Sequence, residues 1–361
     1  MSKINFSGPI NSLSFGNVSI NMLRSLRNKG ADVCFFPLGK SLDFSAYDKI
    51  DEDLKDWIKS CSDNRLTSLD PESPSLKMWH LNGSESGIGQ NQYLYTFYEC
   101  DAPTLSERNI CSIQKKCIFS SSHAEESFKE SGCKNTDYVP IGFDTDFYET
   151  GKVYLENKIN FGLIGKFEKR KHTAKIIRLW ADRYGNNNDY QLTCCITNPF
   201  FKPEQMGQVI AQSLGGKKYT NINFLPYLKT NSEMNELYNS IDINLSGLSG
   251  AEGWNLPAFN STCLGKWSVV LNCTSHKDWA TKENSILVEP DGQEPIYDGA
   301  FFQEGQDFNQ GNLNTFSDQS FYKSLDQAIN KYSKRNDKGV ELKQTFTYDN
   351  TIEKILKIIN K

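Results

Sequence analysis

The feature that most constrains the fold is a repeated alternation between short apolar runs and segments with helical periodicity. In the first part of the chain the runs KINFS (3–7) and DVCFFP (32–37) flank residues 17–29, whose apolar side chains recur at helical spacing, and Gly30 is placed to end that helix. Further strand candidates are residues 76–79, 93–98, 116–120 and 136–141, with a helix at 122–131. Strands that alternate with helices indicate βαβ units and a parallel sheet covered by helices.

The same alternation is repeated after a short polar stretch at residues 144–157. The strand candidates there are 159–164, 191–196, 222–226, 241–246, 267–271 and 285–288, separated by helical patterns such as 173–184 and 232–238. We therefore expect an α/β chain of two tandem Rossmann-like domains with a deep interdomain cleft. The first domain spans 1–155 and is completed by a C-terminal helix at 345–361, and the second spans 156–344. A ligand is expected in the cleft, beyond the carboxyl ends of the strands.

One segment interrupts the alternation. Residues 290–317 are rich in Gly, Gln, Asn and Asp, and they predict a long ordered loop or insertion near the cleft.

Composition narrows the classes of function. With 361 residues, of which 38% are hydrophobic, the chain is long and apolar enough for two cores. No apolar run is as long as a membrane span and the N-terminal residues lack the pattern of a signal peptide, so a cytoplasmic location is expected. The net charge is −4, divided into −5 for residues 1–155 and +1 for the rest, which argues against non-specific binding to nucleic acid or to a membrane surface. The ten cysteines show no CxxC or zinc-type spacing, which favours reduced thiols and no structural metal.

The segment FGLIGKFEKRKHTAKIIR (161–178) places cations directly after a buried strand. The strand ends at Gly165, and Lys166, Lys169, Arg170 and Lys171 follow before a helix begins. Cations at a strand-to-helix turn suit a diphosphate group. The alternative is a basic turn that is only solvated.

A second segment, LSGAEGWNLPAFNSTCLGKWSVVL (248–271), places a carboxylate next to a helix start. Glu252 follows a strand and a Ser/Gly loop, and the helix is expected to open near Leu256 and Pro257. The amides at the helix start suit an anion, whereas Glu252 suits the hydroxyls of a sugar. The alternative is a capping glutamate without a ligand.

Together, the two segments resemble the motifs of retaining glycosyltransferases of the GT-B fold, family 4 (glycosyl transferases group 1) in particular. The G-[RK]-…-K turn of that family is similar to GKFEKRK (165–171), and its E-G-[FW]-x-L-P-x-x-E motif is similar to EGWNLPAFN (252–260). The N-terminal half is also similar, in the runs YTFYECD, IFSSSHAEESFKESG and VPIGFDTDFY, so the resemblance spans nearly the whole chain.

The resemblance implies a role for individual residues in the second half. Lys166 and Lys171 match the cations that hold the donor diphosphate, and Glu252 matches the carboxylate that contacts the transferred sugar. The amides around that carboxylate are matched by Gly253, Trp254, Asn255 and Leu256. Asn260 stands where the family usually has a second Glu that binds the ribose, and an amide can still accept from one hydroxyl and donate to another.

Further roles follow for residues on the rim and the acceptor side. Gly16 matches the small residue that lets the backbone of the first domain approach the donor, and Tyr227 stands where the family meets the base. His80 follows a predicted strand and is expected to face the cleft, where it would meet the acceptor or the charge that develops on the sugar; a surface or core histidine is the alternative. Glu99 and Asp101 are alternative acceptor-side carboxylates.

The activity implied by the resemblance is transfer of a hexose from a nucleotide sugar to an acceptor hydroxyl with retention of configuration. A UDP-sugar is the favoured donor and a GDP-sugar is the alternative. The lysines would neutralise the leaving diphosphate, so neither a cofactor nor a metal is expected. The acceptor stays open between a glycan, a lipid-linked sugar and a modified DNA base, and the oligomeric state is open too.

Two other classes of protein compete with this interpretation. One is a viral-type glucosyltransferase that modifies DNA bases, which would need a positive cleft. The other is a non-catalytic protein that binds sugar nucleotides, or an epimerase, built on the same architecture.

Overall fold

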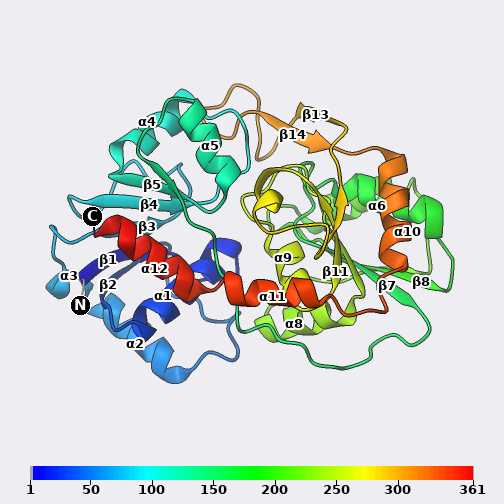
Figure 1. Cartoon of the computed structure of the whole chain (residues 1–361), viewed down its shortest axis with the longest axis horizontal. Helices are drawn as coiled ribbons and strands as arrows, with labels where there is room; N and C mark the ends of the chain where they lie inside the picture. The colour runs from blue at the N-terminus through cyan, green and yellow to red at the C-terminus, as the bar shows by residue number, and fades with distance from the viewer. Residues whose placement is uncertain (1–2, 361) are drawn as a thin grey trace.

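The computed structural model describes residues 3–360, and its core is formed by two parallel six-stranded sheets, each covered by helices (Figure 1). The strand order is β2-β1-β3-β4-β5-β6 in the first sheet and β12-β11-β10-β7-β8-β9 in the second. The predicted class, α/β with two tandem Rossmann-like units, is therefore confirmed.

The first sheet uses residues from the first 138 positions. Its strands are β1 (Lys3–Gly8), β2 (Asp32–Pro37), β3 (Ser75–Met78), β4 (Gln92–Thr96), β5 (Lys116–Phe119) and β6 (Thr136–Tyr138). The helices of this unit are α1 (Ser14–Asn28), α2 (Glu52–Asp63), α3 (Arg65–Ser68), α4 (Leu105–Ile113) and α5 (Ser122–Glu130). Ile4, Phe6 and Phe35 are fully buried, as expected for strands covered on both faces.

The second sheet repeats the pattern. Its strands are β7 (Ile159–Ile164), β8 (Tyr190–Cys195), β9 (Ile222–Phe224), β10 (Ile243–Gly247), β11 (Trp267–Leu271) and β12 (Ile286–Val288). The helices here are α6 (Thr173–Tyr184), α7 (Pro203–Ser213), α8 (Asn231–Ser240), α9 (Leu256–Cys263) and α10 (Asp318–Ile329), with a short 3-10 helix η1 (Thr274–Asp278). Numbered from β7, the strand order is that of a dinucleotide-binding fold.

The last two helices return the chain to the first unit. Helix α11 (Asp337–Thr345) leads away from the second sheet, and α12 (Tyr348–Ile359) packs beside α1 (Figure 1). Ile352 and Ile355 of α12 are fully buried, and Ser25 of α1 donates to Asp349 over 2.5 Å. The domain limits predicted from the sequence stay predictions. The packing of α12 beside α1 agrees with a first domain that the C-terminal helix completes.

Each sheet has one pair of neighbouring strands where the direction of the chain order reverses. The pairs are β1 with β3 and β7 with β10. In open α/β sheets, ligands bind in the crevice outside the carboxyl ends of the strands at such a switch point. The predicted site residues follow these four strands: Gly16 follows β1, His80 follows β3, the turn 165–171 follows β7 and Glu252 follows β10.

Residues 290–317, which we call the strap, contain two strands where the sequence predicts a long ordered loop or insertion. They contain an antiparallel pair, β13 (Gly292–Pro295) and β14 (Asn312–Thr315), which lies between the two units in Figure 1. Ile296, Phe302 and Leu313 of the strap are buried in one apolar cluster with Leu94 and Tyr98 of the first unit. The strap therefore joins the second unit to the first.

Two findings concern the chemistry of the chain as a whole. The ten cysteines are present as free thiols. Between residues 3 and 360 no helix is both long and apolar enough to cross a membrane.

Candidate active site

The basic turn after β7 does not present its four cations to one place. Lys169 is exposed and turns toward the strap, where its ammonium donates to the backbone oxygens of Pro295 over 2.6 Å and Tyr297 over 3.2 Å. Gly165 begins the turn with φ +136, a conformation that L residues rarely adopt, and the Lys171 side chain passes 3.6 Å from where a Cβ would stand. The turn thus directs Lys171 and Lys169 to different surfaces.

Arg170 and Lys171 converge on Glu252. The Lys171 ammonium donates to Oε1 of Glu252, and the Arg170 guanidinium lies 3.0 Å from Oε2. Burial alone would raise the pKa of the Glu252 carboxyl, but Arg170 and Lys171 together hold it well below its usual range. Burial lowers the pKa of Lys171, and Glu252 counters this effect. Glu252 is therefore an ionised carboxylate held between two cations.

Two further carboxylates surround the same cations. Glu168 lies 2.8 Å from both Lys166 and Arg170, and Glu99, from the segment after β4, lies 3.8 Å from Arg170. The cluster consists of the carboxylates of Glu99, Glu168 and Glu252 and the cations Lys166, Arg170 and Lys171. Three negative and three positive charges make it electrically balanced.

The carboxylate motif leads into α9 as the sequence predicts. Asn255 caps the helix with φ +68, and its side-chain oxygen accepts from the amide of Ala258. Its amide group donates to the carbonyl of Ser246 over 2.9 Å and contacts Nε2 of His276 over 2.9 Å. Because Nδ1 of His276 faces the carbonyl of Leu271 at 2.8 Å, Nδ1 carries the proton and Nε2 accepts from Asn255. Burial lowers the pKa of His276 to about 4, so the ring is neutral.

The backbone between Glu252 and α9 supplies free amides. In the part of the chain that the structure describes, the N–H groups of Gly253, Trp254 and Asn255 donate to no protein acceptor. The Trp254 ring is buried against Phe259 and is therefore part of the core. A Cβ on Gly253 would lie 2.8 Å from Cβ of Phe97 in the first unit, so glycine allows the two units to touch here.

Asn260 lies one turn inside α9 and is 3% exposed. Among residues 3–360 its Oδ1 has no hydrogen-bond partner, although the group is buried beside Tyr238. A buried acceptor without a partner is costly, and a ligand hydroxyl would satisfy it.

Gly16 has a different setting from the expected one. The sequence places it in a loop, but it lies in the first turn of α1, because that helix begins at Ser14. A Cβ at Gly16 would lie 2.2 Å from the backbone oxygen of Asn11. The glycine is therefore required by the fold of the loop 9–13 against α1, and its approach to a donor stays a prediction.

Tyr227 lies on the rim of the cleft. It is 42% exposed, and its hydroxyl donates to Oγ of Ser12 over 2.7 Å. This bond joins the loop after β9 to the loop after β1, at the carboxyl ends of both sheets.

His80 follows β3 by two positions, and its place in the cleft stays a prediction. Its ring packs on Phe15 with centroids 4.2 Å apart and contacts Trp79. His80 is exposed at its surface, but desolvation by neighbouring groups lowers its pKa, while Glu99 opposes this shift. Asp101, in contrast, is taken up by the strap, because it accepts from the amide of Asn312 over 2.8 Å.

No family profile matches the chain, and no curated relative was found. Solved structures do match over their full length. Sucrose-phosphate synthase from Thermosynechococcus elongatus shares 12% identity and a TM-score of 0.67, with 100% of this chain and 98% of that chain covered. Anabaena HepE in complex with UDP and glucose shares 12% identity and a TM-score of 0.68, with both chains covered completely. A glycosyltransferase from Rickettsia africae shares 11% identity and a TM-score of 0.67, with 99% and 98% covered.

The chain has the GT-B fold. The fold expected from the resemblance is thus confirmed. At this level of identity the likeness concerns architecture, and the roles of single residues rest on their own geometry.

The GT-B units contain no group of three or more His, Cys, Asp or Glu side chains suited to a metal among residues 3–360. Asp144 and Asp146 have the spacing of a DxD motif, but both carboxylates contact side chains of α1. Asp144 accepts from Asn17 over 2.6 Å, and Arg24 lies 2.9 Å from Asp146.

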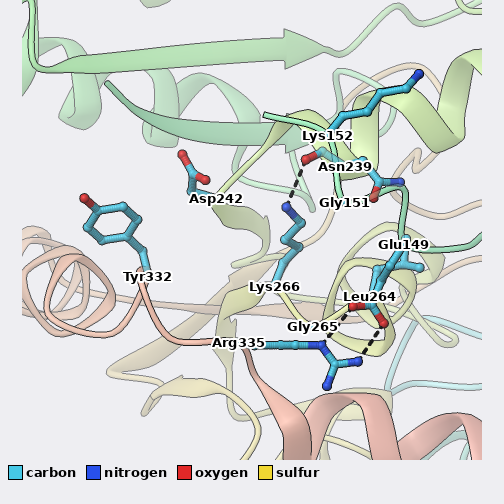
Figure 2. Close-up of a pocket in the computed structure, with 10 residues that line it drawn as sticks. All are labelled: Glu149, Gly151, Lys152, Asn239, Asp242, Leu264, Gly265, Lys266, Tyr332 and Arg335. Atoms are coloured by element: carbon cyan, nitrogen blue, oxygen red, sulfur yellow. Dashed lines mark hydrogen bonds and ion pairs between the residues drawn. The ribbon is translucent and has the colours of Figure 1, made fainter. Parts of the chain in front are cut away.

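Of two cavities, one lies outside the cluster and the other includes Glu168 of the cluster in its lining. One, of about 220 Å³, is at the amino ends of β10 and β11, on the side of the GT-B sheet away from Glu252. Figure 2 shows that two of its charged groups are paired, since Lys266 donates to Asn239 and Arg335 donates to Glu149. The other, of about 380 Å³, adjoins the basic turn and is lined by Phe167, His172, Phe201, Phe301 and other residues.

The sequence analysis missed several members of the site. Glu168 was visible only as part of a charged run, and Thr274 and His276 follow β11, more than 20 positions after Glu252. Thr274 accepts from the amide of Glu252 over 3.3 Å. The order of the strands could have identified Thr274 and His276, since the segments after the parallel strands β10 and β11 meet at one edge of the sheet.

Proposed function

We propose that this chain is a glycosyltransferase that moves a hexose from a nucleotide sugar to an acceptor hydroxyl with retention of configuration. The observation that carries the proposal is the ionised Glu252 at the switch point of the second sheet, held by Lys171 beside the free amides that precede α9. A solved GT-B structure with UDP and glucose supports a nucleotide sugar as the donor. We favour a UDP-sugar over a GDP-sugar.

The diphosphate would bind between Lys171, Lys166 and the amides of residues 253–256. The Lys171 ammonium has three donors, so it can bind a phosphate oxygen and still contact Glu252. Amides at the start of α9 add the positive end of a helix dipole. Lys166 is about one-third exposed, which leaves it accessible to a ligand.

The sugar and the nucleoside would occupy different parts of the motif. Glu252 is ionised, so it accepts hydrogen bonds from sugar hydroxyls. The free Oδ1 of Asn260 suits a ribose hydroxyl. Tyr227, on the loop after β9, would lie beside the base.

Retention follows when the acceptor attacks from the face that the diphosphate leaves. The bond between the anomeric carbon and the phosphate oxygen breaks, the acceptor oxygen bonds to that carbon, and the acceptor proton passes to the departing phosphate. Lys166 and Lys171 stabilise the charge on that phosphate. His80 and Glu99 are on the acceptor side, and we propose that no cofactor or metal is required. A cytoplasmic location stays a prediction of the sequence.

The test is a panel of UDP- and GDP-sugars, read by thermal stabilisation and then by donor hydrolysis without acceptor. We expect one donor to raise the melting temperature and to be hydrolysed slowly to a sugar whose configuration matches the donor. Stabilisation without any hydrolysis or transfer would instead support a binding protein. A shift of labelled duplex DNA at low salt would favour the DNA-base glucosyltransferase.

A further inference from the structure

Arg170 differs from the other cations of the basic turn because it faces only the protein. Its side chain is 7% exposed, compared with 37% for Lys166 and 39% for Lys169. One terminal nitrogen of the guanidinium donates to a backbone oxygen, whereas Nε lies 2.8 Å from Glu168 as an ion pair without a hydrogen bond. A residue enclosed in this way cannot turn toward a ligand without breaking the cluster.

The contacts of Arg170 converge on the segment that ends in Glu252. One terminal nitrogen donates to the carbonyl of Ala251 over 2.7 Å and lies 3.0 Å from Oε2 of Glu252. The backbone oxygen of Arg170 accepts from the amide of Gly250 over 2.7 Å and from Oγ of Ser249. Both ends of Arg170 therefore hold residues 249–252 in place.

The other nitrogens of the Arg170 guanidinium face two further carboxylates. Nε lies 2.8 Å from Glu168, and the second terminal nitrogen lies 3.8 Å from Glu99 of the first unit. Burial opposes the charge of Arg170, but Glu168 and Glu252 raise its pKa, so it stays a cation. Without it, the three carboxylates would face only two cations.

Glu252 has two cationic partners, and the Lys171 side chain, at 14% exposed, is more accessible than that of Arg170, at 7%. Lys171 would be shared with the diphosphate, which weakens its hold on Oε1. Arg170 contacts the other oxygen, Oε2, and its side chain is the less exposed of the two. The Glu252 carboxylate would then still be held by Arg170 during sugar transfer.

We propose that Arg170 is a positioning residue that keeps the Glu252 carboxylate aimed at the transferred sugar while Lys171 is engaged by the donor diphosphate. This inference rests on the proposed function. A lysine would supply the charge but not the planar fork that reaches Glu252, Ala251 and Glu168 together.

The test measures turnover, donor KM and the dissociation constant of the nucleoside diphosphate in the full chain. Arg170→Met is expected to lower kcat about 30-fold or more and to weaken nucleoside-diphosphate binding less than about tenfold, because the loss falls on the transition state. Arg170→Lys should lie between that variant and the wild type. Lys169→Met, on the same turn but bonded to the strap, is the matched control and should change kcat less than about twofold.

A double-mutant cycle separates positioning from general destabilisation. If Arg170 acts through Glu252, Arg170→Met combined with Glu252→Gln is no slower than Glu252→Gln alone. Full additivity of the two losses, or a loss of nucleoside-diphosphate binding as large as in Lys171→Ala, would overturn the proposal.

A spectroscopic readout keeps the proposal testable apart from the activity. If the wild type transfers no sugar from any donor, the proposed function fails, and the question about Arg170 is decided by carbon NMR of the Glu252 carboxyl. The pKa of that carboxyl should rise in Arg170→Met and less in Arg170→Lys. An unchanged pKa in both variants would show that Arg170 does not hold Glu252.

Discussion

At the scale of single residues, Glu252 and Asn260 are eight positions apart but meet different surroundings. Glu252 is paired with cations in the loop, and Asn260 has a free oxygen inside α9. We expect Glu252→Gln to lower turnover by about 100-fold with a modest loss of nucleotide affinity, because its contacts strengthen as charge develops on the sugar. Asn260→Ala should raise the donor KM and leave turnover closer to the wild type. Steady-state kinetics with varied donor measures both.

The control for the ribose contact restores the residue that is usual in the resembling family. Asn260→Glu should keep or improve donor binding. The assignment is wrong if this change abolishes binding while Asn260→Ala has no effect.

His276 predicts a pH dependence of stability. It is buried as a neutral ring with a pKa of about 4, below the ordinary value of 6.5, so the unfolded chain takes up its proton first as the pH falls. The stability that His276 contributes is present above pH 6.5 and is lost between pH 6.5 and 4, by about 3 kcal/mol at pH 4. Urea unfolding of the wild type and of His276→Gln between pH 7 and pH 4.5 measures the difference in slope. Equal slopes would mean that the ring is not held neutral.

The sequence predicts some residues of the site and not others, and the reason is physical. Lys171 and Glu252 stand in local motifs, so their types and spacing are informative without a structure. Lys169 looks equivalent to Lys171 in the sequence, but the strap takes it away from the cleft. His276 has no local signal, because it acts through a bond to Asn255 that only the parallel sheet creates.

At the scale of elements, one of the contacts between the strap and the first unit is especially close. Gly311 has φ +129, and a Cβ there would lie 2.1 Å from Oδ1 of Asp101. We expect Gly311→Ala to destabilise the protein by about 3 kcal/mol and to expose the strap to proteases. Gly299→Ala is the matched control, since Gly299 has φ +74 with open space around it and should cost about 1 kcal/mol.

Urea unfolding and limited proteolysis measure these two changes. If the two variants unfold and are cleaved alike, the contact with Asp101 does not fasten the strap.

Several elements with an apolar core were predicted, whereas α2 and α10 were not, although both bury apolar side chains. The run INFGLI forms β7 with the predicted limits, and the predicted helix 173–184 is α6. The strand β13 has the sequence GQEP and is exposed at every position, so no periodicity marks it. It is held by pairing with β14 and by Lys169, and neither is visible in a local pattern.

At the scale of the whole molecule, the two units meet across the carboxyl ends of their sheets. Ser120 donates to the carbonyl of Gly253 over 2.9 Å, and Tyr227 bonds to Ser12. The cations available to a diphosphate are side chains of the protein itself. We therefore expect transfer to survive excess chelator to within about threefold. Loss of all activity, restored by manganese or magnesium, would show that a metal carries the charge instead.

The central claim is that Lys171 binds the diphosphate of a nucleotide sugar, and calorimetry tests it most directly. UDP and uridine are titrated into the wild type, Lys171→Ala and Lys169→Ala. We predict that Lys171→Ala weakens UDP binding by about 1.5–3 kcal/mol, as expected for a hydrogen bond to a charged group, while uridine binding is little changed and Lys169→Ala resembles the wild type. Equal losses for UDP and uridine in Lys171→Ala, or no binding of UDP by the wild type, would contradict the claim.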